Sequence, residues 1–287
     1  MPGRRSRRIR ALAKINLSLR IVGARADGYH ELQTVFQSIA LHDTLVLRAN
    51  DGPFALECGD PACPVDRRNL VWRAAERVWR AAGRRGSPRG FAIELTKRIP
   101  IEAGLGGGSS DAAAAVRLLG GWLGVGEEAQ RDVAAALGAD VPYFLEGGTA
   151  LGLDRGDLLF PLLDEPKAWV ALAVPGFGVS TKEAFSWWDQ SSAARRSPKA
   201  GRGSHALMND LEAPVARRHP VIGRLVRALK RAGAAHAAMS GSGSAVFGLF
   251  DDRPAAERAG RRLGRGVRVF ITPTVGRKAY RRLTAIG

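Results

Sequence analysis

Apolar residues recur at every second position near the start of the chain. The alternating set is Ile9, Ala11, Ala13, Ile15, Leu17, Leu19 and Ile21. A period of two predicts a half-buried strand with one apolar and one polar face. Lys14, Asn16 and Ser18 should share the polar face. The glycines that follow, between residues 23 and 28, predict a turn.

Short apolar or alternating runs predict further strands, and runs with a 3.6-residue period predict helices. The expected strands cover residues 32–39, 44–47, 91–95, 169–174, 244–250 and 267–271. The expected helices cover residues 69–82, 110–119, 127–137, 207–217, 221–231 and 255–263. Residues 191–204 are mostly small or basic and predict a loop or disordered insert.

The mixture of strands and helices lacks a strict βαβ rhythm, which favours an α+β fold. A chain of 287 residues suits two domains. The expected bounds are 1–160 and 161–287, with the boundary expected between residues 153 and 169.

Composition narrows the functional classes. No apolar run approaches the ~18 residues of a membrane span, and no apolar region follows the basic N-terminus, so a cytoplasmic protein is expected. Cys58 and Cys63 lack zinc-site spacing, and no role is predicted for them. The net charge of +17 suits nucleic acid or an anionic small molecule. Because no aromatic residues interleave a basic stripe, we expect a small-molecule substrate, with neither nucleic acid nor membrane as partner.

A glycine-serine run is the strongest chemical signal. It lies between an expected strand and an expected helix and comprises Gly104, Leu105, Gly106, Gly107, Gly108, Ser109 and Ser110. Glycines allow close backbone approach, and a helix N-terminus offers free N–H groups to phosphate. A serine hydroxyl there also suits Mg²⁺, and Asp111 is expected to complement the helix dipole. The run is neither a Walker A loop nor a dinucleotide fingerprint. The alternative is a flexible loop with a helix cap.

The run from Gly104 to Ala112 resembles the phosphate loop of the GHMP kinase superfamily. Four further segments agree in order, at residues 13–17, 25–30, 138–142 and 240–244. The triple glycine and Gly28-Tyr29-His30 resemble one branch, the 4-diphosphocytidyl-2-C-methyl-D-erythritol kinases of non-mevalonate isoprenoid synthesis. The resemblance extends from about Arg10 to the last expected strand.

This resemblance implies phosphoryl transfer from ATP, with Mg²⁺, to a hydroxyl of a cytidine-diphosphate-linked polyol. It implies an N-terminal ATP-binding lobe similar to domain 2 of ribosomal protein S5 and a ferredoxin-like, substrate-binding C-terminal lobe. The chain departs from the family pattern at Leu12, where proline is common, and at Glu102, where a small residue is common.

The resemblance also implies roles for individual residues. Asp140 would be the catalytic carboxylate and Lys14 its partner, with Asn16 holding substrate. From the residues alone, Asp140 equally suits a turn before a proline, and Lys14 a solvated strand position. Tyr29 and His30 would recognise the base by stacking and hydrogen bonds, although a tyrosine over the core and a surface histidine are the plainer alternative.

Two further positions follow the same pattern. Phe185 would close the other side of the base, or it belongs to the core of an amphipathic helix. Gly241 and Ser242, in the run 240–244, would form a tight turn beside substrate or phosphate, or a plain β-turn.

Two other functions remain in competition. One is a different GHMP kinase, of the mevalonate or homoserine type, which a substrate panel would distinguish. The other is a basic RNA-binding protein, whose binding would weaken steeply with salt. That second reading gives no reason for Asp140 in its motif or for the serines of the glycine loop. A monomer or weak homodimer is expected.

Overall fold

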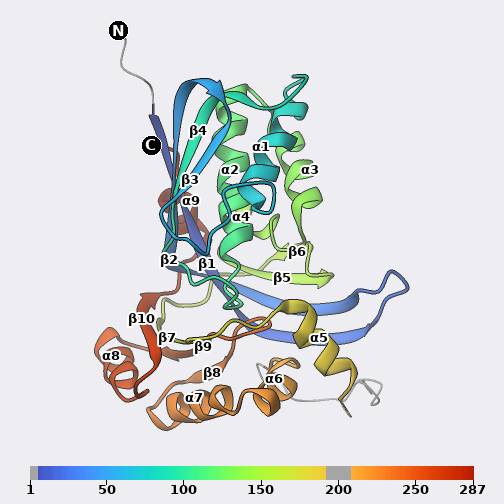
Figure 1. Cartoon of the computed structure of the whole chain (residues 1–287). Helices are drawn as coiled ribbons and strands as arrows, with labels where there is room; N and C mark the ends of the chain where they lie inside the picture. The colour runs from blue at the N-terminus through green and yellow to red at the C-terminus, as the bar shows by residue number, and fades with distance from the viewer. Residues whose placement is uncertain (1–5, 192–207) are drawn as a thin grey trace.

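The computed structural model describes residues 6–191 and 208–287, which form two β-sheets covered by helices (Figure 1). The insert expected at residues 191–204 lies outside the described residues apart from Ser191. Within the described ranges, no helix is both long enough and apolar enough to cross a membrane.

The first sheet has six strands in the order β3-β4-β2-β5-β6, with β1 paired to β2. The strands are β1 (Ser6–Ala24), β2 (His30–Pro53), β3 (Ala55–Cys58), β4 (Arg89–Thr96), β5 (Thr149–Asp154) and β6 (Leu158–Pro161). β1 and β2 form a long antiparallel hairpin. The two short strands expected at 32–39 and 44–47 are both parts of the continuous strand β2.

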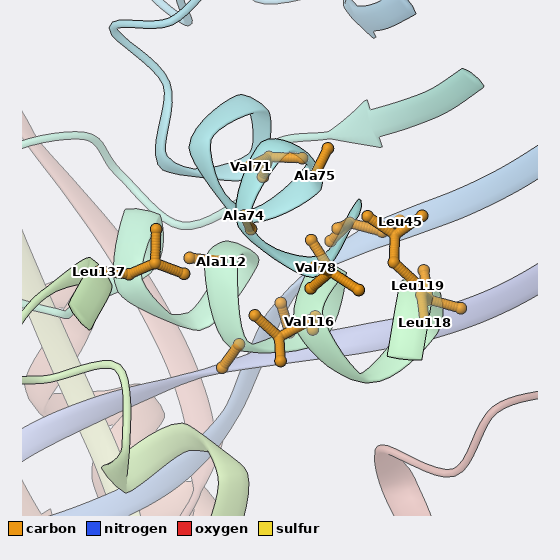
Figure 2. Packing of buried hydrophobic residues seen from close by; sticks show 14 of the residues in the cluster. Leu45, Val71, Ala74, Ala75, Val78, Ala112, Val116, Leu118, Leu119 and Leu137 are labelled. Carbon is orange, nitrogen blue, oxygen red and sulfur yellow. The ribbon is translucent and has the colours of Figure 1, made fainter. Parts of the chain in front are cut away.

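Helices cover one face of this sheet (Figure 1). They are α1 (Leu70–Ala81), α2 (Gly107–Leu123), α3 (Glu127–Leu137) and the single turn α4 (Tyr143–Glu146). Figure 2 shows Val78 of α1 next to Val116 of α2, inside a cluster of small and branched side chains. The alanines at 112–115 are all buried, and their small size lets α2 approach its neighbours closely.

The second sheet is antiparallel, in the order β10-β7-β9-β8. Its strands are β7 (Trp169–Pro175), β8 (His236–Met239), β9 (Val246–Phe250) and β10 (Val267–Pro273). Its lobe contains α5 (Thr181–Asp189), α6 (Glu212–Arg218), α7 (Pro220–Arg231) and α8 (Arg253–Arg261). The division expected at residue 160 stays a prediction.

The last helix, α9 (Arg277–Leu283), returns to the first sheet. The Tyr280 hydroxyl donates a hydrogen bond to the carbonyl of Phe144 at 2.7 Å. Arg8 and Gly287 exchange both backbone hydrogen bonds, so the end of the chain pairs with β1.

The expected alternation of β1 holds at its ends, where Arg10 and Arg20 are exposed, but it is wrong for the middle of the strand. Lys14 and Asn16 are only 4% and 2% exposed, and Leu12 is fully buried. Register shifts at Leu12/Lys14 and Asn16/Ser18 interrupt the alternation. Both faces are covered because β1 passes from the first lobe into the second, so the alternative of a solvated Lys14 is also excluded.

The starts of two helices differ from expectation. α2 begins at Gly107 rather than near 110, because the loop glycines themselves adopt helical geometry. α6 begins at Glu212, later than the expected 207. The helix expected at 127–137 has those bounds in the structure.

Candidate active site

A cleft of about 1160 Å³ brings together segments that are far apart in sequence. Its walls come from the β1–β2 hairpin, the glycine loop, the segment before α4, helix α5 and the turn after β8. All the proposed site residues line this cleft except Ser110.

Two glycines of the loop lie too close to their surroundings for a side chain to be tolerated. Gly104 and Gly106 adopt φ values of 74° and 68°, which favour glycine. A Cβ at Gly104 would lie 2.1 Å from the carbonyl oxygen of Ser240, and one at Gly106 would lie 2.6 Å from Cζ of Phe144. A Cβ at Gly108, by contrast, would meet open space. The loop is therefore braced on its inner side and open on the side of the cleft.

The start of α2 suits the phosphates of a nucleotide. Its first turn, from Gly107, carries backbone N–H groups without partners inside the helix and the positive end of the dipole. Gly107, Gly108 and Ser109 all line the cleft. The Ser110 hydroxyl instead donates to the carbonyl of Leu12 at 2.7 Å and is buried. Ser109, not Ser110, therefore offers its hydroxyl to a ligand.

Asp111 does not complement the helix dipole as expected. It lies beyond the first turn, which contains no acidic residue. Its carboxylate instead accepts a hydrogen bond from Lys97 Nζ at 2.7 Å. Lys97 also pairs with the fully buried Asp43. Burial raises the pKa of Asp111 to about 8, against the attraction of Lys97. Its Oδ1 is buried without a hydrogen-bond partner.

Lys14 and Asp140 form an ion pair in the lining of the cleft. Lys14 Nζ lies 3.6 Å from Oδ2 of Asp140, which precedes α4. The ammonium is buried, whereas the carboxylate is about one-third exposed. Burial lowers the pKa of Lys14, and the negative charge of Asp140 opposes that shift. Asp140 thus helps to keep the buried lysine charged.

Asn16 fixes the lysine from the neighbouring position on β1. Lys14 Nζ donates to Asn16 Oδ1 at 2.6 Å, and Asn16 Nδ2 donates to Thr34 Oγ1 at 2.8 Å. The Thr34 hydroxyl donates in turn to the carbonyl of Ser18. These three hydrogen bonds connect the ammonium of Lys14 to the first sheet and orient the amide group of Asn16.

Aromatic side chains gather at the end of the cleft formed by the β1–β2 hairpin. The rings of His30 and Phe185 are stacked, with centroids 4.8 Å apart and planes at 21°. Phe185 also packs against the apolar cluster of the second lobe, so both alternatives given for it describe part of its environment. Tyr29 is 59% exposed and therefore does not cover the core. Arg155 lies over its ring at 5.7 Å.

The turn after β8 reaches the same cleft as the glycine loop. Gly241 has a φ of 54°, and the Ser240 hydroxyl donates to the carbonyl of Gly104 at 2.9 Å. Ser242 is 3.2 Å from the Thr181 hydroxyl at the start of α5. These contacts join the turn to the glycine loop on one side and to α5 on the other.

Sequence reasoning missed Lys97 and Asn209. Asn209 is buried, and its Nδ2 donates to the carbonyls of Met239 and Gly241, each at 2.8 Å. The local pattern gives no signal for Asn209, because its partners lie on another part of the chain. The one available signal for Lys97 was its place just before the glycine loop, where a cation suits a phosphate site.

Comparison with known proteins gives the family. The description "GHMP kinases N terminal domain" matches residues 69–148, and "GHMP kinases C terminal" matches residues 193–268. A 4-diphosphocytidyl-2-C-methyl-D-erythritol kinase from Solibacter usitatus is 41% identical, over 96% of this chain and 90% of the relative. One from Moorella thermoacetica is 42% identical, over 88% of this chain and 93% of the relative.

Solved structures of GHMP kinases have the same fold as this chain. A crystal structure of 4-(cytidine 5'-diphospho)-2C-methyl-D-erythritol kinase superposes with a TM-score of 0.77 at 35% identity, covering 94% of this chain and 99% of that one. Homoserine kinase from Cytophaga hutchinsonii shares the fold, with a TM-score of 0.72 at 21% identity and 96% of each chain covered. The α+β fold predicted from the sequence is confirmed. The chain belongs to the 4-diphosphocytidyl-2-C-methyl-D-erythritol kinase family of the GHMP kinases.

Proposed function

We propose that this protein transfers the γ-phosphoryl group of ATP to a hydroxyl of 4-diphosphocytidyl-2-C-methyl-D-erythritol, a step of isoprenoid precursor synthesis. The curated relatives carry that name over most of this chain's length. The observation that carries the proposal is the Lys14–Asp140 pair, which lies in one cleft with the glycine loop and the aromatic end.

Asp140 would orient the acceptor hydroxyl and accept its proton as the new P–O bond forms. Its partial exposure leaves the carboxylate open to a ligand on the cleft side. Lys14 would stabilise the carboxylate and the negative charge that develops on the attacking oxygen. The 2.6 Å bond to Asn16 holds the ammonium in place for this task.

The N–H groups at the start of α2 would bind the phosphates of ATP, with Gly108 leaving room for them. Within the described ranges, no cluster of three His, Cys, Asp or Glu side chains is placed to hold a metal ion. Mg²⁺ would therefore enter with ATP, held mainly by phosphate oxygens and by the Ser109 hydroxyl. Bound there, it would neutralise charge on the phosphoryl group.

Tyr29, His30 and Phe185 would bind the cytosine base at the other end of the cleft, with Gly241 and Ser242 beside the polyol. Aromatic faces suit a base, and the net charge of +17 suits a diphosphate. We propose a cytoplasmic enzyme that acts on small molecules alone, as a monomer or weak homodimer.

The test is a phosphorylation assay with Mg²⁺-ATP and a panel of acceptors: the cytidine compound, mevalonate, homoserine and galactose. Phosphate transfer to the cytidine compound alone is expected. Transfer to a different acceptor would move the protein to another branch of the GHMP kinases.

The residue roles need variants. Asp140→Ala and Lys14→Ala are each expected to lower kcat by about 100-fold or more. Asp132→Ala removes an exposed carboxylate from α3, outside the cleft, and should retain full turnover. If both cleft variants remain folded and active, the assigned roles are wrong.

A further inference from the structure

His30 has a second contact besides its stack on Phe185. Its Nε2 lies 2.7 Å from Oδ1 of Asp189, the last residue of α5. Trp188 meets the same ring edge-on, with centroids 5.6 Å apart. Three residues of α5 therefore hold the imidazole, whose side chain is only 11% exposed.

The spacing along α5 places these contacts on one side of the helix. Thr181, Phe185 and Asp189 are four residues apart, so they share a face, and all three line the cleft. Phe185 contacts the flat side of the His30 ring, while Asp189 contacts its edge. The helix thus fixes both the plane of the ring and its rotation within that plane.

Helix stability does not account for Asp189. A negative charge in the last turn faces the negative end of the helix dipole, which is unfavourable. α5 has no basic residue in its last turn to offset that charge. The carboxylate is also half exposed, so no requirement of the core selects it. Its one hydrogen bond among the described residues is to His30.

A carboxylate accepts hydrogen bonds and cannot donate them. The Asp189 contact therefore places the imidazole proton on Nε2. In a neutral ring, Nδ1 is then an acceptor. Nδ1 has no hydrogen-bond partner within 6–191 and 208–287, so it is left for a ligand.

We propose that Asp189 is a positioning residue that makes His30 selective for a base bearing an exocyclic amine. The amine of cytosine donates a hydrogen bond to an acceptor, whereas the carbonyl oxygen at the same position of uracil would face the lone pair of Nδ1. Asp189 thus sets the choice between cytidine and uridine ligands through His30. This inference rests on the base-binding end of the proposed function.

The test measures the binding of CDP and UDP by calorimetry, which needs no turnover. Wild-type protein should bind CDP at least about tenfold more tightly than UDP, the typical worth of a hydrogen bond in a closed site. Asp189→Asn keeps the shape but lets the amide donate to Nε2, so the two affinities should come within about threefold. Asp189→Glu restores a carboxylate and should recover part of the preference.

The matched control is Glu183→Gln, which removes one negative charge from an exposed position of the same helix, outside the cleft. It should keep the wild-type preference, and all variants should bind ATP as the wild type does. In turnover assays, Asp189→Asn should raise KM for the cytidine compound and leave kcat nearly unchanged.

A wild-type preference retained in Asp189→Asn would overturn the inference, as would equal binding of CDP and UDP by the wild type. The proposed function fails separately, if the wild type transfers no phosphate to the cytidine compound. A protein that prefers CDP through Asp189 without transferring phosphate would uphold the inference alone.

Discussion

Lys14 and Asp140 form a pair in which one partner is buried and the other is open to the cleft, with 3.6 Å between nitrogen and oxygen. Burial lowers the pKa of the lysine, and the aspartate opposes that effect. Lys14 therefore depends on Asp140 for part of its positive charge, while the carboxylate stays open to a ligand in the cleft.

The first prediction follows from that dependence. Asp140→Asn removes the attraction that favours the ammonium, so the pKa of Lys14 should fall further below its ordinary value. An NMR titration of the lysine Cε signals would measure it, with Lys14→Ala identifying the resonance. An unchanged titration would mean that Asp140 does not control the charge of Lys14.

The second prediction compares two glycines of the loop, one needed for stability and one needed to leave room for ATP. Gly106→Ala places a methyl group against Phe144 at a left-handed φ, and should cost about 1–3 kcal/mol of unfolding free energy. Gly108→Ala points into open space within α2 and should leave stability equal or slightly higher. Its methyl group should nonetheless weaken ATP binding. Urea unfolding and calorimetry give the two quantities, and strong ATP binding by Gly108→Ala would place the phosphates elsewhere.

The third prediction concerns pH. Burial raises the pKa of Asp111 to about 8 in the folded protein, from an ordinary value of 3.8. Between these values the folded state binds more protons, so the free energy of unfolding should fall as pH rises from about 4 to 8. Asp111→Asn should flatten that dependence. Urea midpoints at several pH values would show it, and identical slopes in both proteins would contradict it.

The fourth prediction addresses the turn after β8. Asn209→Asp keeps the size but removes the amide protons that bind the carbonyls of Met239 and Gly241. The loss should destabilise the protein by about 1–3 kcal/mol. It should also raise KM, because the turn that carries Gly241 and Ser242 loses these two bonds. The control is Asn50→Asp, which makes the same change at an asparagine whose amide donates an exposed hydrogen bond to the carbonyl of Pro53. Equal KM values in the two variants would show that Asn209 does not hold the substrate side of the turn.

Local patterns predicted the parts of this fold that depend on neighbouring residues. The bounds of α3 follow from its apolar period, and Asn69 begins α1 through a bond to the N–H of Val71. The start of α2 was missed because glycines are poor helix formers and give no periodic signal.

The site was predictable only where family resemblance supplied what local pattern lacks. The sequence placed Asp111 at a helix start, but its partner Lys97 comes from the segment after β4. Ser110 has the residue type of a phosphate ligand, yet its hydroxyl is turned to Leu12 on β1. Such orientations depend on contacts between elements that are remote in sequence.

Strand β1 contributes to the cores of both lobes, and this affects how the protein unfolds. Ile9 and Ala11 pack in the core of the first lobe, whereas Leu19 and Ile21 pack in that of the second. Between them, Ala13, Ile15 and Leu17 lie in a third cluster, which contains residues of both sheets. Because one strand contributes to each of these clusters, neither lobe can lose its structure without exposing apolar surface of the other. The two lobes should therefore melt in a single cooperative transition, and fragments cut between them should reassemble only when both are present.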